Sequence, residues 1–201
     1  MQSDTIAEFV WVWAAGYRSP TRFITGIRTK PAPHWGVTAQ IVRGLLDGVG
    51  LYLPLTILGR SPSTPSALTL LPTDQYYAAS VILAPVFLLL QWLMLCALLH
   101  VILRVTGRPS DIDQILNITG MAALVVGTVL VPWDWVMIAT GWMDPVLLGV
   151  SHMVVTLWGV ALIVIGFRDI LDLSLRTSIG LSVVWLLVAW PLAAVFMRPP
   201  V

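Results

Sequence analysis

Residues 76–104, YYAASVILAPVFLLLQWLMLCALLHVILR, form the longest almost uninterrupted apolar run of the chain. At about 1.5 Å per residue, a helix of this length exceeds the roughly 30 Å hydrocarbon core of a bilayer. Two tyrosines open the run and Arg104 closes it. Aromatic and cationic residues at the two edges are typical anchors of a membrane-spanning helix. The stretch therefore predicts a transmembrane helix, with a bend at Pro85.

The composition of the whole chain agrees with a membrane environment. Of its 201 residues 58% are hydrophobic and only 10% are charged, whereas a soluble domain has about 25% charged residues. Lipid must therefore be most of its solvent. A net charge of +1 argues against a nucleic-acid partner, which requires a concentrated basic face. The single cysteine, Cys96, cannot form an intrachain disulfide.

Four further apolar segments surround the first one, separated by a Pro/Ser/Thr-rich loop, a tight polar turn, a Trp-rich loop and a short charged link. We therefore expect an all-α polytopic membrane protein, with one transmembrane domain over residues 34–201. The five predicted spans lie at about residues 36–58, 76–104, 112–131, 145–167 and 177–196. Residues 132–144, with three tryptophans and two aspartates, are expected to be an aromatic belt and a loop.

Residues 1–33 are expected to form an amphipathic segment on the cytoplasmic surface. Its first part, residues 3–17, begins with the capping residues Ser3 and Asp4, but its apolar part is too short to span a bilayer. A disordered tail is the alternative for this part. Ser19 and Pro20 are typical of a helix start, and the sequence that follows is basic and amphipathic, as in helices that lie on anionic membranes.

The cations of the predicted loops are strongly asymmetric. Five spans place the two chain ends on opposite sides, and the positive-inside rule then favours a cytoplasmic N-terminus and an external C-terminus. In this N-in, C-out arrangement only Arg60 and Arg198 are external. The cytoplasmic cations are Arg18, Arg22, Arg28, Lys30, Arg104, Arg108, Arg168 and Arg176.

Two spans carry small residues four positions apart, a pattern that lets helices approach closely. Gly44 and Gly48 form such a face in the first span, and Ala123 and Gly127 in the third. We expect both faces to pack against other helices.

Other polar residues are placed to start and fix the third span. Ser110 and Asp113 have the spacing of a capping box, which predicts a helix start at Ser110. Asn117 and Thr119 lie one to two turns further on, and we expect their side chains to bond within the bundle.

Ionisable residues inside predicted spans are the main functional candidates. Arg43 and Asp47 lie four residues apart, on one helix face of the first span. Their pair either relays protons or ions, anchors a partner helix, or fixes helix packing, and the packing role is the simplest of these.

The histidines His100 and His152 invite comparison with bis-histidine haem ligation. Their positions near opposite ends of their spans predict a separation of ~15–20 Å along the membrane normal, too far to share one iron. We expect His100 to bond to a neighbouring helix instead. The sequence carries no zinc spacing, phosphate loop, dinucleotide motif or nucleophile–base pair, so no cofactor, metal site or catalytic residue is predicted.

The chain resembles the bacterial branch of the Yip domain family, five-span membrane proteins named for binding Ypt/Rab GTPases. Three pieces carry the resemblance over about residues 16–196: a helix start before the first span, an aromatic residue near the far end of that span, and a polar turn after the second. Their residues are Ser19, Pro20 and Phe23; Leu51, Tyr52 and Pro54; and His100, Gly107, Ser110, Gln114 and Gly120.

The resemblance implies a role in membrane organisation through partner binding rather than chemistry. Met121 stands where the family often has tyrosine, and the acidic D-L-Y-G-P motif of eukaryotic members is absent, which argues against a Rab-type partner. We therefore expect a non-enzymatic scaffold or accessory subunit in the bacterial inner membrane, in contact with lipids and other integral membrane proteins. The alternative is a small transporter or a quinone- or proton-handling subunit that uses Arg43, Asp47 and His100.

Overall fold

The computed structural model describes residues 6–63, 65, 71–142 and 144–198. Within this part of the chain every regular element is helical. The elements are α1 (Ile6–Arg18), α2 (Pro20–Arg28), α3 (His34–Asp47), η1 (Gly48–Tyr52), α4 (Leu53–Ile57), η2 (Thr73–Gln75), α5 (Tyr76–Val105), α6 (Ile112–Thr140), α7 (Pro145–Ile170) and α8 (Leu175–Phe196).

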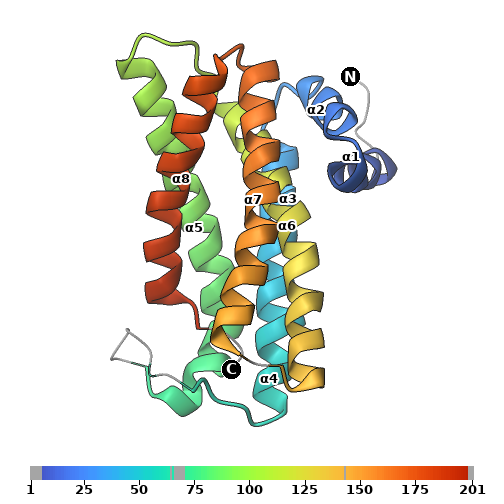
Figure 1. The fold of residues 1–201 in the computed structure, drawn as a ribbon, viewed down its shortest axis with the longest axis vertical. Coiled ribbons are helices and arrows are strands. Elements are labelled where there is room, and N and C mark those ends of the chain that lie inside the picture. Colours follow the sequence, from blue (N-terminus) through green and yellow to red (C-terminus); the bar gives the residue numbers. More distant parts are fainter. Residues whose placement is uncertain (1–5, 64, 66–70, 143, 199–201) are drawn as a thin grey trace.

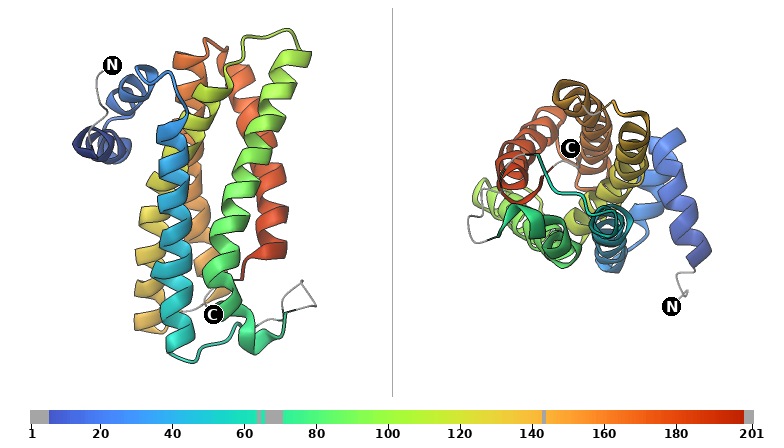
Figure 2. Two further views of the ribbon diagram at one scale, coloured as in Figure 1. Left: turned by 180° about the vertical axis from the view of Figure 1, so that it is seen from behind. Right: turned by 90° about the horizontal axis from the view of Figure 1, so that it is seen from below.

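Five long elements form a ring. Helix α3 packs against α5 and α6, α6 against α7, α7 against α8, and α8 back against α5 (Figure 1 and Figure 2). The four helices α5, α6, α7 and α8 are long and apolar enough to cross a membrane. Their exposed surface is apolar as well, with large side chains such as Ile82, Val154 and Leu187 on the outside. This is the surface expected of helices that lipid solvates.

The first element of the ring is not a regular helix throughout. Helix α3 passes directly into the π-helix η1 after Asp47 and then into α4, with Pro54 in its first turn. Proline has no N–H to donate to the carbonyl four residues earlier, which here belongs to Gly50. The indole Nε1 of Trp135 on α6 donates to that carbonyl at 2.8 Å. This bond ties the irregular segment to α6.

Helix α6 corrects the predicted third span. It continues to Thr140, with Pro132 inside it, so the helix end expected near residue 131 and the loop expected from residue 132 were wrong. A proline is tolerated within a membrane helix when neighbours satisfy the backbone groups it frees. The additional turns carry Asp134 into the bundle, where it is buried.

The start of α6 is also different from the prediction. Asp111, not Ser110, caps the helix, and its carboxylate accepts hydrogen bonds from the backbone N–H groups of Asp113 and Gln114 at 3.0 and 3.2 Å. The preceding turn contains Gly107 in the left-handed region (φ 67°), a conformation that glycine adopts without steric cost.

Helices α1 and α2 pack on each other and lie outside the ring, against α6 and α7 (Figure 2). The apolar face predicted for α2 is buried, with Phe23, Ile24 and Ile27 nearly inaccessible. Helix α2 begins at Pro20 as expected, although the Ser19 side chain makes no capping bond. The predicted caps Ser3 and Asp4 lie outside the described residues.

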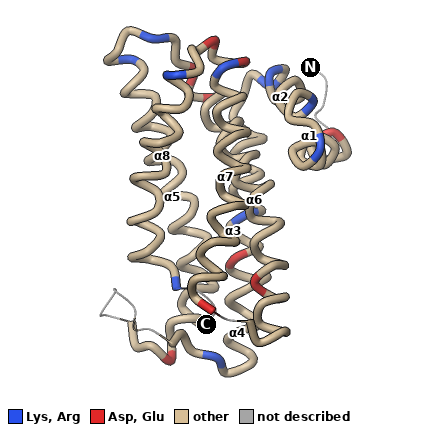
Figure 3. The backbone as a smooth tube through the Cα atoms, in the orientation of Figure 1, with Lys and Arg blue, Asp and Glu red and all other residues tan. Residues whose placement is uncertain are grey.

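Charged residues are unevenly distributed along the bundle. Figure 3 shows most of them at the end that carries α1 and α2, and few at the end where α4 and the C-terminus lie. A small group lies between the two ends, near α3 and α6, and Asp47 on α3 and Asp134 on α6 are buried. Because buried charges are costly in an apolar bundle, this internal group is the natural candidate for a functional site.

Candidate functional site

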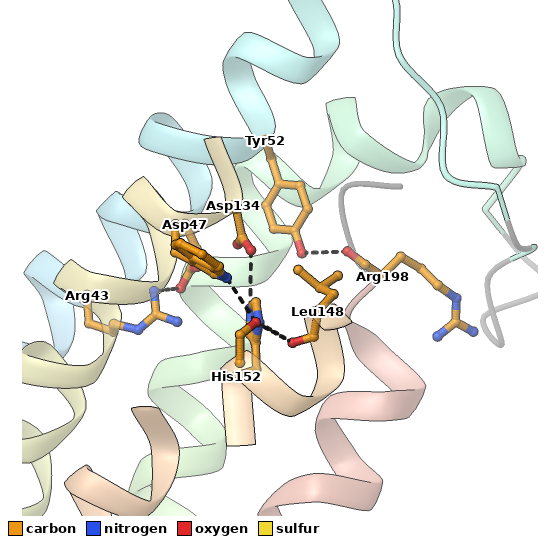
Figure 4. Close-up of polar contacts among 9 residues, drawn as sticks. Arg43, Asp47, Tyr52, Asp134, Leu148, His152 and Arg198 are labelled. Atoms are coloured by element: carbon orange, nitrogen blue, oxygen red, sulfur yellow. Dashed lines mark hydrogen bonds and ion pairs between the residues drawn. The ribbon is translucent and has the colours of Figure 1, made fainter. Parts of the chain in front are cut away.

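A cavity of about 480 Å³ lies inside the ring, toward the end where α4 and the C-terminus are found. We call it the charged cavity. Its walls come from α3, η1, α5, α6, α7 and the end of α8. The ionisable side chains that line it are Arg43, Asp47, Tyr52, Asp134, His152 and Arg198 (Figure 4).

Arg43 and Asp47 form an ion pair within α3, between Arg43 Nη1 and Asp47 Oδ2. The sequence spacing placed them on one helix face, and the structure brings the two charged groups together in the interior, where Asp47 is only 3% exposed. The arginine passes across α6 at Gly127: a Cβ atom there would overlap Arg43 Cδ and Nε. Gly127, expected to serve helix packing, thus makes room for the Arg43 side chain.

A second pair joins α6 to α7. The Nε2 atom of His152 lies 3.2 Å from Asp134 Oδ1, and Asp134 is 4% exposed. The other ring nitrogen, Nδ1, lies 2.9 Å from the carbonyl oxygen of Leu148 one turn earlier in α7. His152 was a candidate from the sequence, whereas Asp134 was missed because the predicted span ended before it. Its spacing of seven residues from Gly127, which returns to the same helix face, is the signal that could have found it.

The open end of the cavity is formed by η1 and by the residues that follow α8. Tyr52 is buried and donates its hydroxyl to the carbonyl oxygen of Arg198 at 3.3 Å. The Arg198 guanidinium bonds to the backbone carbonyls of Pro65 and Ala194, at 3.0 and 2.6 Å. The Arg198 guanidinium therefore donates its hydrogen bonds to backbone carbonyls at the mouth of the charged cavity.

A smaller cavity of about 150 Å³ lies between α6, α7 and α8. It shares Arg43, Val126 and Thr156 with the charged cavity, so the Arg43 side chain stands where the two spaces meet. Ala123, predicted as a packing residue, lines this smaller cavity.

His100 is not part of the charged cavity. Its Nδ1 atom lies 2.7 Å from the hydroxyl of Ser110, near the end of α5, whereas His152 lies near the start of α7. The two imidazoles therefore contact different partners, and His100 bonds to the turn before α6 rather than to the face of a neighbouring helix.

Asn117 lies at the opposite end of α6 from Asp134 and is completely buried. Its Nδ2 donates to the carbonyls of Ala32 and Lys30 at 2.8 and 3.3 Å, and its Oδ1 accepts from Gly36 N–H at 2.8 Å. Gln114 adds a bond from Nε2 to the Lys30 carbonyl at 2.8 Å. The start of α3 has no side-chain cap of its own, so Asn117 supplies one from another helix. We call Gln114, Asn117 and these backbone partners the amide network.

Glycines allow the close approach of helices at two places. A Cβ on Gly36 or on Gly120 would overlap the backbone of the other helix, so α3 and α6 touch backbone to backbone there. The predicted pair Gly44 and Gly48 faces α5: a Cβ on Gly44 would lie 3.0 Å from Pro85 Cα, and one on Gly48 would overlap the Val81 carbonyl.

Comparison with protein families gives one match: the model of the Yip1 domain matches residues 17–195, most of the chain. The chain belongs to the Yip1 domain family. Neither the curated proteins nor the solved structures contain a match to it. With four helices able to cross a bilayer, this Yip1 domain protein is a multi-pass membrane protein.

The residues that carried the family resemblance in the polar turn have clear structural roles. His100 and Ser110 bond to each other, Gly107 adopts the left-handed conformation, Gln114 holds the link before α3, and Gly120 contacts Gly36. The charged cavity uses other residues, apart from Tyr52. Among the described residues, no three His, Cys, Asp or Glu side chains are grouped to hold a metal ion. The side chains that line the charged cavity can form ion pairs and hydrogen bonds and can exchange protons.

Proposed function

We propose that this Yip1 domain protein is a five-span integral membrane protein, N-in and C-out, that acts without enzymatic activity as a scaffold or accessory subunit of a larger complex. We place it in the bacterial inner membrane, because the sequence resembles the bacterial branch of the family.

The fifth span in this proposal is the continuous element from α3 through η1 to α4. It runs from His34 to Ile57 without a gap, which corresponds to roughly 36 Å at about 1.5 Å per residue. Its neighbours on both sides are α5 and α6, two of the helices that are apolar enough to span. The excess of cations at the α1–α2 end supports a cytoplasmic location for that end.

The topology can be tested with single cysteines and a membrane-impermeant maleimide, starting from Cys96→Ala. Thr29→Cys and Arg108→Cys should be labelled only in inverted vesicles, and Arg60→Cys only in intact cells. If α3 to α4 did not span, Thr29→Cys would be labelled from the same side as Arg60→Cys. That result would reduce the protein to four spans.

The observation that supports partner binding is a groove of about 400 Å³ between α5 and α8. Helix α8 buries only Ser178, Leu181 and Ser182 within the described chain, so most of its surface is available to lipid or to another protein. The groove is mainly apolar, and Leu83 and Leu90 line it while remaining partly exposed. A transmembrane helix of a partner protein has the shape and polarity to occupy it.

Native purification in mild detergent, with identification of co-migrating proteins, tests this role. Leu90→Trp should fill the groove and remove the partner. Ile82→Trp, on α5 but outside the groove and also exposed (71% against 60% for Leu90), should leave the partner bound. A protein that migrates strictly alone, or a partner lost equally in both variants, would contradict the proposal.

The charged cavity favours a second candidate function, a transporter or a proton-handling subunit. Buried ionisable groups in membrane proteins commonly mark ion or proton pathways, and here Arg43 and Asp47 join Asp134 and His152, in the place that the sequence suggested for His100. Arg43→Ala combined with Asp47→Ala would then abolish a proton- or substrate-dependent flux in vesicles while insertion and partner binding persist. Unchanged flux in this variant would leave only the scaffold role.

A further inference from the structure

We propose that Asp134 and His152 together bind one exchangeable proton inside the charged cavity. The inference uses the cavity of the second candidate function but does not require net transport. It follows from the atoms that surround the imidazole ring and from the charges that face it.

The first proton on the ring is located by Leu148. Its carbonyl oxygen lies 2.9 Å from His152 Nδ1, and a carbonyl can only accept a hydrogen bond. Nδ1 therefore carries a hydrogen. In a neutral imidazole the other nitrogen, Nε2, is then an acceptor with an exposed lone pair.

The second contact requires another proton. His152 Nε2 lies 3.2 Å from Asp134 Oδ1, within ion-pair distance, and without a further proton the acceptor nitrogen of a neutral imidazole would stand beside an ionised carboxylate oxygen. A proton on Nε2 makes an imidazolium–carboxylate pair, and a proton on Asp134 makes a carboxylic acid facing a neutral imidazole. In both cases the pair holds one proton more than the separate ionised carboxylate and neutral imidazole.

The surrounding charges favour this loaded state. Arg43 and Asp47 on α3 neutralise each other, and Tyr52 on η1 gives its hydroxyl to a backbone carbonyl. Arg198 after α8 is bonded to backbone carbonyls at the mouth. The residue that α5 contributes to the lining is the apolar Leu88. With the proton bound, the charges of Arg43, Asp47, Asp134 and His152 sum to zero, apart from the Arg198 cation at the mouth; without it, one buried carboxylate has no paired cation, which is costly in an apolar environment.

The site is also accessible to proton exchange. The charged cavity reaches Pro145, Met197 and Arg198 at the end of the bundle. The side chain of His152 is 30% exposed, whereas that of Asp134 is 6% exposed. His152 thus stands between the open space and the buried carboxylate. A proton that enters from the charged cavity therefore meets the His152 imidazole before the Asp134 carboxylate.

The experiment is NMR of the full chain in lipid nanodiscs with isotope-labelled histidine, together with infrared spectroscopy of the carboxyl groups. His100→Gln and His152→Gln assign the signals. At neutral pH we expect either the imidazolium signature for His152 or a protonated-carboxyl band that Asp134→Asn removes. Raising the pH should abolish that signature in a single titration, and Asp134→Asn should abolish it at neutral pH.

The His100 signal serves as the folding control for Asp134→Asn, because His100 bonds to Ser110 at the other end of the bundle. A neutral His152 beside an ionised Asp134 at neutral pH in the unmutated protein would overturn the proposal. A bound proton without any flux would refute the transport function alone, and flux without the shared proton would refute only the present inference.

Discussion

The amide network and the charged cavity are two buried polar regions on the same helix, α6, and they differ in kind. In the amide network, neutral side chains bond to backbone groups of the link before α3. In the charged cavity, ionisable side chains from α3, α6 and α7 pair with one another beside open space. Neutral amides bonded to backbone have one state and fix geometry, whereas groups that gain or lose a proton can change state. The first region is suited to holding the fold, and the second to function.

The largest expected effect comes from breaking the Arg43–Asp47 pair. Arg43→Met leaves the Asp47 carboxylate buried without its partner, and removing one member of a buried pair costs about 3–5 kcal/mol of unfolding free energy. The loss of unfolding free energy is measured in detergent, with circular dichroism as the probe of unfolding.

The matched control is the double variant Arg43→Met with Asp47→Leu. Replacing both members by apolar residues is often neutral, so most of the stability should return. If the double variant were as unstable as the single one, the pair would contribute through packing and not through charge.

A smaller effect is expected at the contact between Gly120 and Gly36, which brings the amide network together. Gly120→Ala forces a Cβ into the backbone of α3, and overpacking of this kind costs about 3 kcal/mol. Gly180→Ala in α8, where nothing lies within 4 Å of the added atom, should be neutral or should stabilise the helix by up to about 1 kcal/mol. Equal melting temperatures for the two variants would contradict the close contact.

The smallest of the three effects tests the amide network directly. Asn117→Ala leaves the Gly36 N–H and the Ala32 carbonyl without their partner, at a cost of about 2 kcal/mol. Gln91→Ala removes a single bond to the Ala189 carbonyl and should cost about 0.6 kcal/mol, as is typical between membrane helices. Thermal unfolding of both variants, compared with the unmutated protein, gives the ratio of the two losses of stability. A flux or proton signal altered by Asn117→Ala without loss of stability would erase the distinction between the two regions.

Most of the fold prediction rested on the length of the apolar runs and on the residues that are typical of helix starts. The long run at residues 76–104 reappears as α5, and Ser19 and Pro20 mark the start of α2 as expected. The prediction was wrong at the end of the third span, because Pro132 and the tryptophans around it are typical of a loop. Proline can stand inside a membrane helix where neighbouring groups satisfy the backbone carbonyl that it frees. A sequence does not show which groups will be neighbours.

The amino-acid sequence by itself determined that this is a helical membrane protein, because a chain with so few charges can satisfy its surface only in lipid and its backbone only in helices. It also placed Arg43 and Asp47 on one face, since residues four apart meet on any helix. Only the tertiary structure decided that Asp134 and His152 pair, that His100 bonds to Ser110, and that Asn117 caps a helix it does not belong to. These contacts join residues from different helices, and their register depends on where backbones can touch, as they do at Gly36 and Gly120.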